Sequence, residues 1–192
     1  MAAGRPKIFD EKEAIRKTAK LFWKKGYAAA GTEDLLKVMN LGRGSLYHNF
    51  GSKDNLFKMS ISQFLDDTLT QLRQEAAKVN NPMEFVKEFF RAIASADEQV
   101  HHLGCFLGNA MAELSNVNPE LESYAADKQK KFEEFFYECA LRAKELGFIK
   151  TEPKLLARHL LNLWNGINIT RRMYPEKKEL LPVINFNLQL IE

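Results

Sequence analysis

Apolar residues recur at steps of three and four along most of the chain, which is the spacing of amphipathic helices. The first helix is predicted over Asp10–Lys25, where Ile15, Ala19 and Phe22 share one face and lysines occupy the other. No segment shows the strict alternation of apolar and polar residues that is typical of a half-buried strand. The pattern therefore predicts an all-α fold of about nine helices.

Capping residues, glycines and prolines divide the second part of the chain into further helices. Asn81 and Asn118 each stand directly before a proline, which favours the first position of a helix, and Gly147 follows the end of a long periodic run. The helices predicted after residue 56 cover residues 57–78, 82–96, 103–115, 119–146, 151–173 and 176–191.

The stretch Thr32–Leu56 differs from the rest because its predicted helices are short and closely spaced. Thr32 is expected to cap a helix over 33–39, where acidic side chains meet the positive end of the helix dipole. Asn40 tolerates the left-handed conformation that ends a helix tightly. A second short helix follows over 43–49, so this stretch predicts two helices joined by a compact turn.

The helix over 43–49 carries many hydrogen-bond donors and little apolar bulk, which suits a groove better than a core. Its donor and small residues are Arg43, Gly44, Ser45, Tyr47 and His48. Ser52 is expected to cap the next helix, and Lys53 lies beside the free amides of its first turn. This combination favours binding of a phosphate group.

The run Leu-Gly-Arg-Gly-Ser-Leu-Tyr-His-Asn-Phe, followed by Ser-Lys-Asp-Asn-Leu, resembles the N-terminal domain of the TetR (tetracycline repressor) family of bacterial transcription regulators. In that family the helix beginning at Arg43 would be the recognition helix. Three residues depart from the family pattern: Asn40 replaces a usual glycine, Gly42 a usual serine, and Gly31 a frequent threonine or serine. The first two departures keep the backbone geometry, and the third weakens one expected phosphate contact.

The resemblance implies a helix-turn-helix DNA-binding domain over 1–52 and a helical effector-binding and dimerisation domain over 53–192. Arg43 is suited to a guanine edge or a phosphate, and Ser45 and His48 to base edges. Two alternatives remain open, because Tyr47 could belong partly to the core and His48 could face only solvent. The expected DNA-binding residues are Thr32, Arg43, Gly44, Ser45, Tyr47, His48 and Lys53.

The charge distribution agrees with a DNA-binding N-terminal half. The net charge is +3, but residues 1–60 hold 12 Lys and Arg against 6 Asp and Glu, whereas the rest hold 16 against 19. Contacts with a phosphate backbone favour such an excess of cations, although surface charge can also serve solubility alone. Arg5 and Lys7 form a short basic arm that could reach DNA, the alternative being a disordered tail.

The resemblance also implies an effector site and a homodimer in the second domain. The residues expected around an apolar or aromatic effector are Phe85, Phe89, Met111, Phe136, Trp164, Asn165 and Asn168. In the family the last two helices pair with those of a second copy. The apolar stripes available for such pairing are Leu156, Leu160, Leu163 and Ile167, and then Ile184, Leu188 and Ile191. Each of these side chains could instead be plain core.

Cys105 is a candidate redox sensor. It follows His101 by four residues and His102 by three, so an imidazolium could lower its pKa, or His101 and Cys105 could share a metal. The segment Gly-Cys-Phe-Leu-Gly-Asn resembles a subgroup of the family in which some members sense electrophiles or oxidants through a cysteine. The alternative is a small buried residue that fills a helix crossing. Because further ligands are not in evidence, no metal site is predicted.

Several classes of protein are disfavoured by the sequence. It contains no phosphate-binding glycine loop, no Gly-x-Ser-x-Gly and no paired-cysteine metal motif, and His159 has no evident catalytic partner. An enzyme is therefore not expected, and no cofactor is predicted. Two cysteines make no disulfide framework, and no stretch of about 18 apolar residues indicates a membrane span. A soluble cytoplasmic protein is expected.

We therefore expect a homodimeric transcriptional regulator, most simply a repressor, on a pseudo-palindromic double-stranded DNA operator. A small-molecule effector or a thiol modification would release it by moving the fourth helix and changing the spacing of the two recognition helices. The alternative function is a helical partner-binding adaptor without sequence-specific DNA binding.

Overall fold

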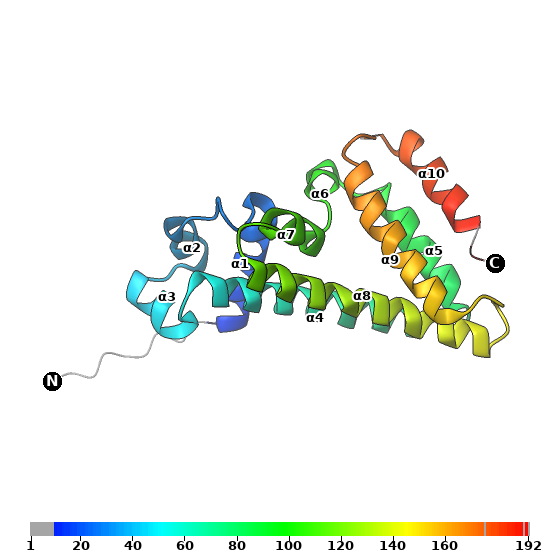
Figure 1. Ribbon diagram of the computed structural model, residues 1–192, viewed down its shortest axis with the longest axis horizontal. Helices are drawn as coiled ribbons and strands as arrows, with labels where there is room; N and C mark the ends of the chain where they lie inside the picture. The colour runs from blue at the N-terminus through cyan, green and yellow to red at the C-terminus, as the bar shows by residue number, and fades with distance from the viewer. Residues whose placement is uncertain (1–9, 175, 190, 192) are drawn as a thin grey trace. The chain divides into compact units, whose positions relative to one another are not determined.

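A computed structural model describes residues 10–174, 176–189 and 191 of the 192-residue chain. Every regular element in these residues is a helix, which confirms the predicted all-α class. Figure 1 shows the helices in order. They are α1 (Glu11–Lys25), α2 (Thr32–Met39), α3 (Arg43–Phe50), α4 (Lys53–Ala77), α5 (Pro82–Ile93), α6 (Glu98–Leu103), α7 (Phe106–Leu114), α8 (Pro119–Glu145), α9 (Pro153–Thr170) and α10 (Lys177–Gln189).

The described residues hold one helix more than the sequence pattern separates, namely the six-residue α6. The basic arm of Arg5 and Lys7 lies outside the described residues. None of the described helices is both long and apolar enough to cross a membrane. The chain divides into two compact units, unit 1 ending at Phe64 and unit 2 beginning at Leu65, so helix α4 belongs to both. The functional boundary expected after residue 52 stays a prediction.

Unit 1 is held together by a small aromatic and aliphatic core. The predicted stripe of Ile15, Ala19 and Phe22 on α1 is buried. The ring of Phe22 meets that of Phe57 on α4 edge-on at 4.9 Å between centroids. Leu46 of α3, at 1% exposure, is buried among the core side chains of the unit. Helices α1, α3 and α4 thus each contribute buried side chains, which fixes α3 by one of its faces only.

Helix α2 has the geometry that the sequence predicts at its C-terminal end but not at its N-terminal end. Asn40 has φ 54° and ψ 45°, which is the left-handed conformation expected for it. The cap predicted at Thr32 is wrong, because Thr32 is the first helical residue and Gly31 is the N-cap. The carboxylate of Asp34, at the third helical position, accepts the amide of the N-cap residue Gly31 at 3.3 Å, as in one half of a capping box.

Unit 2 packs α8 against α7, α9 and α5, and packs α10 against α5. Its largest fully buried side chains include Phe90, Phe132, Phe135 and Phe136. The predicted caps are confirmed, since Asn81 accepts the Met83 amide at 3.0 Å and Asn118 the Leu121 amide at 3.1 Å.

The C-terminal end of α4 is anchored to α8. Arg73 of α4 forms two hydrogen bonds with the Glu138 carboxylate, at 2.8 and 2.9 Å. Arg142 of α8 donates to the carbonyls of Ala76 and Val79 at 3.0 and 2.9 Å. These carbonyls have no partner inside a helix that ends here, so Arg142 supplies one. The end of α4 that belongs to unit 2 is therefore coupled to α8.

The two C-terminal stripes expected to pair in a dimer are instead part of the core of unit 2, apart from the partly buried Leu163. Leu160 and Ile184 are both 0% exposed, and the other members share the same buried cluster. The opposite faces of α9 and α10 carry the exposed apolar residues. The sequence periodicity locates the apolar positions correctly, but it does not tell which apolar face turns toward the chain's own core.

Candidate nucleic-acid interface and sensor residues

Helix α3 buries only two side chains, Leu46 and Phe50, and exposes its remaining six residues. Tyr47 is 49% exposed, so the alternative that places it in the core does not hold. The exposed residues are Arg43, Gly44, Ser45, Tyr47, His48 and Asn49. Sequence reasoning did not single out Asn49, whose amide donates to the Ser45 carbonyl of the same helix at 2.7 Å. One short helix therefore presents a continuous polar surface to solvent.

Arg43 at the start of α3 has a partner that the sequence analysis missed. Its Nη2 donates to Oε1 of Glu33 on α2 at 2.5 Å. The other predicted contact on α2, Thr32, is half-buried at the first helical position. This contact joins residues 10 positions apart, and their opposite charges were the signal available in the sequence.

Lys53 at the start of α4 packs on an aromatic ring instead of extending freely into solvent. Its ammonium lies 4.6 Å from the centroid of Tyr27 and donates to the Ala28 carbonyl at 3.4 Å. The Tyr27 hydroxyl donates to the Asp54 carboxylate at 2.5 Å. Tyr27 and Asp54 thus position the first turn of α4. Sequence spacing gives no signal for this contact, since it joins residues 27 positions apart.

Neighbouring α2 is tied to α1 by a second ion pair. Lys25 donates to the Asp34 carboxylate at 2.9 Å, and this bond is the main reason why the pKa of Asp34 lies below its usual value. The pair holds the two helices that support α3. The Asp34 carboxylate therefore binds both the Lys25 ammonium and the Gly31 amide.

Replacing Lys53 by alanine is expected to weaken binding to all DNA sequences alike. If Lys53 neutralises one phosphate, the slope of log affinity against log salt falls by about 1. The measurement is fluorescence anisotropy with specific and unrelated duplexes at several salt concentrations. Lys144→Ala, which removes the same charge from unit 2, is the control and should keep the parent slope. A Lys53→Ala slope equal to the parent's would exclude the phosphate contact.

The predicted effector residues of unit 2 are partly gathered into an aromatic stack. Phe89 of α5 stacks on Trp164 of α9 at 5.1 Å, and Phe132 of α8 stacks on the same indole at 5.6 Å. Phe136 contacts Phe89 at 6.3 Å, and Phe85 reaches the cluster through Phe135 at 6.5 Å. Met111 lies half-buried on α7. Three helices therefore contribute rings to one aromatic cluster.

A buried polar chain lies beside these rings. Gln129, only 4% exposed, donates to Oδ1 of Asn165 at 2.7 Å. Asn168 donates to the Trp164 carbonyl at 2.8 Å, so its amide stabilises α9 itself. Sequence reasoning missed Gln129, although it continues the apolar phase of α8 between Ala125 and Phe132. The sequence did offer a signal for Gln129, because it is a polar residue at a helix position where the neighbouring turns carry core residues.

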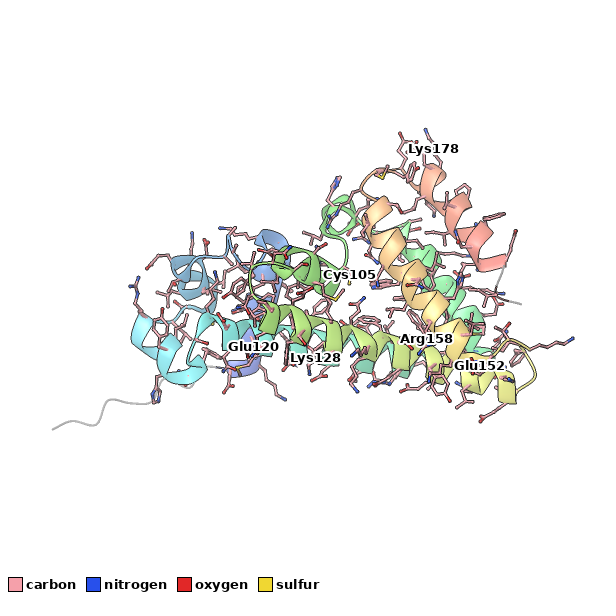
Figure 2. All side chains as sticks on the ribbon, in the orientation of Figure 1. Cys105, Glu120, Lys128, Glu152, Arg158 and Lys178 are labelled. Carbon is pink, nitrogen blue, oxygen red and sulfur yellow. The ribbon has the colours of Figure 1, made fainter. Side chains whose placement is uncertain are left out.

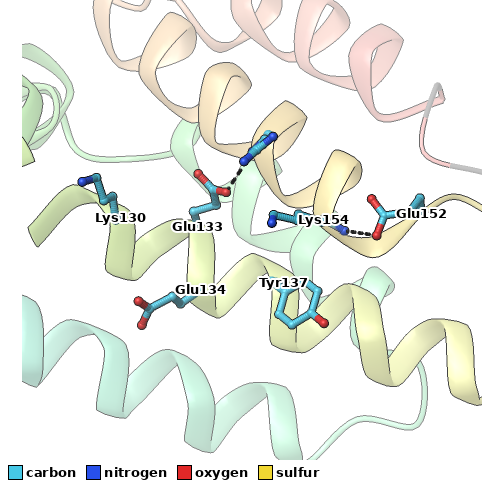
Figure 3. A pocket seen from close by; sticks show the side chains of 7 residues that line it. Lys130, Glu133, Glu134, Tyr137, Glu152 and Lys154 are labelled. Carbon is cyan, nitrogen blue, oxygen red and sulfur yellow. Dashed lines mark hydrogen bonds and ion pairs between the residues drawn. The ribbon is translucent and has the colours of Figure 1, made fainter. Parts of the chain in front are cut away.

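Unit 2 has a surface pocket that is not lined by the predicted effector residues. The pocket between α8 and the start of α9 has a volume of about 520 Å³ (Figure 3). Its lining is Lys130, Glu133, Glu134, Tyr137, Glu152, Lys154 and Arg158. Arg158 pairs with Glu133 at 3.3 Å, and Glu152 accepts the Lys154 amide at 3.1 Å. Six of the seven lining residues are charged, which does not suit an apolar effector.

Cys105 is a buried N-cap residue, 7% exposed, at the start of α7 (Figure 2). Its sulfur accepts the Gly108 amide at 3.4 Å and its thiol lies 3.9 Å from Oε1 of Gln129. Burial raises the pKa of this thiol above its usual value, and the Gly108 hydrogen bond offsets only part of that effect. The expectation of a lowered pKa is therefore wrong, and the packing alternative describes Cys105 in this structure.

The His101 side chain faces the end of α9 and not the Cys105 side chain. Its ring nitrogen Nε2 lies 2.7 Å from the Arg171 carbonyl and 3.3 Å from that of Tyr174, so the buried imidazole caps the end of α9. Within the described residues, no group of three or more His, Cys, Asp or Glu side chains is arranged to hold a metal ion. His101 and Cys105 therefore have separate structural partners.

Comparison with known proteins decides between the classes of function. Residues 14–59 match the family described as bacterial regulatory proteins, tetR family, and residues 82–184 match the tetracyclin repressor-like C-terminal domain. The second match alone covers more than half of the chain. The chain belongs to the tetR family. It is a DNA-binding transcriptional regulator and not an enzyme, as the sequence resemblance implied.

Two curated relatives span most of this tetR-family chain. The uncharacterized HTH-type transcriptional regulator YezE of Bacillus subtilis is 27% identical over 161 residues, covering 82% of this chain and 83% of its own. The HTH-type transcriptional repressor ComR of Escherichia coli is 27% identical over 196 aligned residues, covering 97% and 91%.

Two solved structures share the fold. One is a cysteine mutant of the TetR family regulator CifR complexed with double-strand operator DNA. Its TM-score is 0.82 at 23% identity, over 98% of this chain and 100% of that chain. The other is the reduced form of E. coli NemR, with a TM-score of 0.82 at 19% identity over 95% and 98%. Both likenesses concern the fold.

Proposed function

We propose that this regulator is a homodimeric repressor that binds a pseudo-palindromic operator and is released by a small apolar or aromatic effector. The observation that carries the operator contact is the exposed face of α3. This face holds the hydrogen-bond donors, while Leu46 and Phe50 of the same helix are buried. A helix that is fixed by one face and presents donors on the other is suited to the major groove. The relative ComR is a transcriptional repressor, which supports repression as the direction of regulation. The CifR mutant is complexed with operator DNA, which supports an operator as the DNA partner.

The contacts within this proposal follow from donor chemistry. Ser45 and His48 lie on the exposed face of α3 and are assigned to base edges, with Gly44 allowing close approach. Thr32, Tyr47 and Lys53 are assigned to phosphates, which position the helix without reading sequence.

The homodimer would use the exposed apolar face of α9 and α10, here called the C-terminal face. Its exposed members are Leu155, Ile169, Met173, Val183 and Phe186, with exposures from 49% to 69%. Gly166 lies on the same helix as Ile169, and a Cβ at Gly166 would meet no atom within 4 Å, so a second helix can approach closely there. Such a patch is costly to leave in water. A second copy would cover it with an identical face.

Dimerisation gives the DNA contact its geometry. A twofold dimer presents two copies of α3, and their separation must match the groove repeat of roughly 34 to 36 Å. Helix α4 begins beside the proposed phosphate contact at Lys53 and ends at the anchor formed by Arg73, Glu138 and Arg142. An effector that moves α8 would therefore move the end of α4 with it, which changes the spacing of the two recognition helices.

The effector would contact the cluster of Phe89, Phe136 and Trp164, with Asn165 and Asn168 giving polar direction. Phe85 lies half-buried against the same core and Met111 lies half-buried on α7, and both would complete the contact. Opening such a site requires the rings to separate, since each currently fills space against another. The bound effector would replace the ring contacts that it breaks.

Selection of genomic DNA fragments by the purified protein tests this function. A common pseudo-palindrome, bound with a protein stoichiometry of one dimer, is the expected result. Release of that operator by aromatic compounds would then identify the effector class. Binding without sequence preference, or no gel shift with any fragment, would overturn the proposal in favour of a helical partner-binding adaptor.

Thiol modification at Cys105 is the second candidate signal, because the sulfur lies between α7 and α8 and contacts Gln129. Of the two related structures, one is a cysteine mutant of CifR and the other is the reduced form of NemR.

We expect Cys105→Ser to respond to a quinone or hypochlorite as the parent does. Burial raises the pKa of the thiol, so little reactive thiolate is present at neutral pH. Operator release is measured by anisotropy for both proteins across a range of oxidant concentrations. Release of the parent but not of Cys105→Ser would make Cys105 the sensor and would contradict this expectation.

A further inference from the structure

We propose that Glu33 is a specificity-determining residue, whose carboxylate holds the guanidinium of Arg43 for a guanine edge and away from the phosphate backbone. The inference rests on the proposed operator binding and deepens it. Arg43 by itself could read guanine or clamp a phosphate. The ion pair with Glu33 decides between these two roles.

The geometry places the pair on the solvent side of two adjoining helix starts. Glu33 is the second residue of α2 and Arg43 is the first of α3, and Nη2 of Arg43 lies 2.5 Å from Oε1 of Glu33. The side chain of Glu33 is 79% exposed and that of Arg43 is 65% exposed. The pair therefore lies on the surface that also carries the exposed face of α3. Both helices belong to unit 1, and Figure 1 shows α2 and α3 following each other along the chain.

The chemistry of the guanidinium allows both contacts at once. Arginine has five N–H donors in one plane, and the structure assigns one of the two Nη2 hydrogens to Glu33. The other Nη2 hydrogen and one on Nη1 form a fork that matches O6 and N7 of guanine. A guanidinium that is already held in its plane loses less conformational freedom when it binds. Glu33 thus prepares Arg43 for a planar, bidentate partner.

The charge of Glu33 makes the arrangement selective. Arg43 is the only lysine or arginine in α3, so a carboxylate beside it cancels the fixed positive charge of that helix. This carboxylate repels every phosphate, whatever the base sequence. The cost is offset only where the guanidinium finds a guanine edge. Specificity arises from such a combination of one attractive and one repulsive element.

The stability of the fold does not explain this pair. An exposed ion pair contributes little to folding, and the free amide at the start of α2 is bound by Asp34 and not by Glu33. Asp34 also makes the ion pair with Lys25 that joins α2 to α1. Glu33 is therefore available for a role in binding.

The test compares the parent, Glu33→Gln, Arg43→Lys and the double variant on the operator selected by the parent. Affinity is measured for the operator, for each single base substitution in it, and for unrelated DNA at several salt concentrations. Arg43→Lys identifies the guanine that Arg43 reads. We expect Glu33→Gln to lower discrimination at that same position by about tenfold while binding of unrelated DNA stays equal or becomes tighter. The double variant should discriminate no worse than Arg43→Lys alone.

Glu84→Gln is the matched control, because it removes one exposed acidic residue that has an ion-pair partner from the first turn of α5 in unit 2. It should leave base discrimination unchanged. Intact discrimination in Glu33→Gln, or a loss at a base that Arg43→Lys does not affect, would overturn the inference alone. The same holds if Arg43→Lys alters no base preference. A parent protein without any sequence preference would overturn the inference and the proposed function together.

Discussion

Replacing Ile169 by glutamate is expected to convert the protein to a monomer and to weaken operator binding by about 100-fold or more. Ile169 is 66% exposed on the C-terminal face of α9, so the substitution leaves the core of the protomer intact. In a twofold dimer it would bury two carboxylates in an apolar interface. A monomer offers only one recognition helix and loses the second half-site.

The matched control is Val117→Glu. Val117 is 69% exposed in the link between α7 and α8, outside the C-terminal face, so it places the same charge at an equally exposed apolar residue. Sedimentation velocity measures the oligomeric state, and anisotropy measures operator binding. Ile169→Glu should sediment as a monomer with an unchanged helical CD spectrum, whereas Val117→Glu stays dimeric. A dimeric Ile169→Glu that still binds its operator would place the dimer interface elsewhere.

The C-terminal face also shows where sequence reasoning about α9 and α10 ended. Periodicity located Leu160 and Ile184 as apolar positions on helices, and both are indeed apolar core. It could not decide which of two apolar faces turns inward, because α9 carries apolar residues on both. That decision depends on α5 and α8, which are distant in sequence. A dimer surface could therefore be proposed only after the core was known.

Local rules predicted the parts of the fold that depend on near neighbours. The left-handed Asn40 and the caps at Asn81 and Asn118 follow from side chains within a few residues of the backbone that they serve. The cap predicted at Thr32 failed because α2 begins one residue earlier, with Gly31 at the N-cap position and its amide bound by Asp34. Competing local donors and acceptors decide such cases, and a sequence pattern does not rank them.

The candidate sites show the same difference between contacts with near neighbours in sequence and contacts with distant residues. The exposed donors of α3 other than Asn49 were predicted because one short motif contains them. The partners that position these donors were not, because Glu33 meets Arg43 across a turn and Tyr27 meets Lys53 across a helix pair. Cys105 was judged from its neighbours in sequence, whereas its pKa depends on burial between helices. The sequence shows the type of each residue, but it does not show which side chains surround that residue in the fold.

Replacing Gly104 by alanine is expected to destabilise unit 2 by about 2 to 4 kcal/mol. Gly104 has φ 69° and ψ −154°, a conformation that is essentially restricted to glycine. A Cβ there would lie 2.7 Å from Nη2 of Arg172 and 3.0 Å from the Asn168 carbonyl oxygen. The arginine end can move, but the backbone of α9 cannot move without breaking its own hydrogen bonds. The α6–α7 junction would therefore be forced away from α9.

Gly147→Ala is the comparison for this change. Gly147 also has a positive φ, 79°, but no atom lies within 4 Å of a Cβ built there. It should cost only the backbone strain, about 1 to 2 kcal/mol. Urea unfolding gives both values, and in an Arg172→Ala background the cost of Gly104→Ala should shrink without vanishing, since the Asn168 carbonyl remains. Equal costs at the two glycines would show that contact with α9 does not constrain this junction.

The same substitution should change the chemistry of the neighbouring Cys105. Burial is the main cause of its raised pKa, so a displaced junction that admits water lowers the pKa and increases the thiolate fraction at a given pH. Alkylation by iodoacetamide should therefore be faster in Gly104→Ala than in Gly147→Ala, with Cys139→Ser in both proteins. Cys139 has a pKa raised to about 12 by burial, so its removal leaves one thiol to follow. Equal alkylation rates would mean that the fit of Gly104 against α9 does not control access to Cys105.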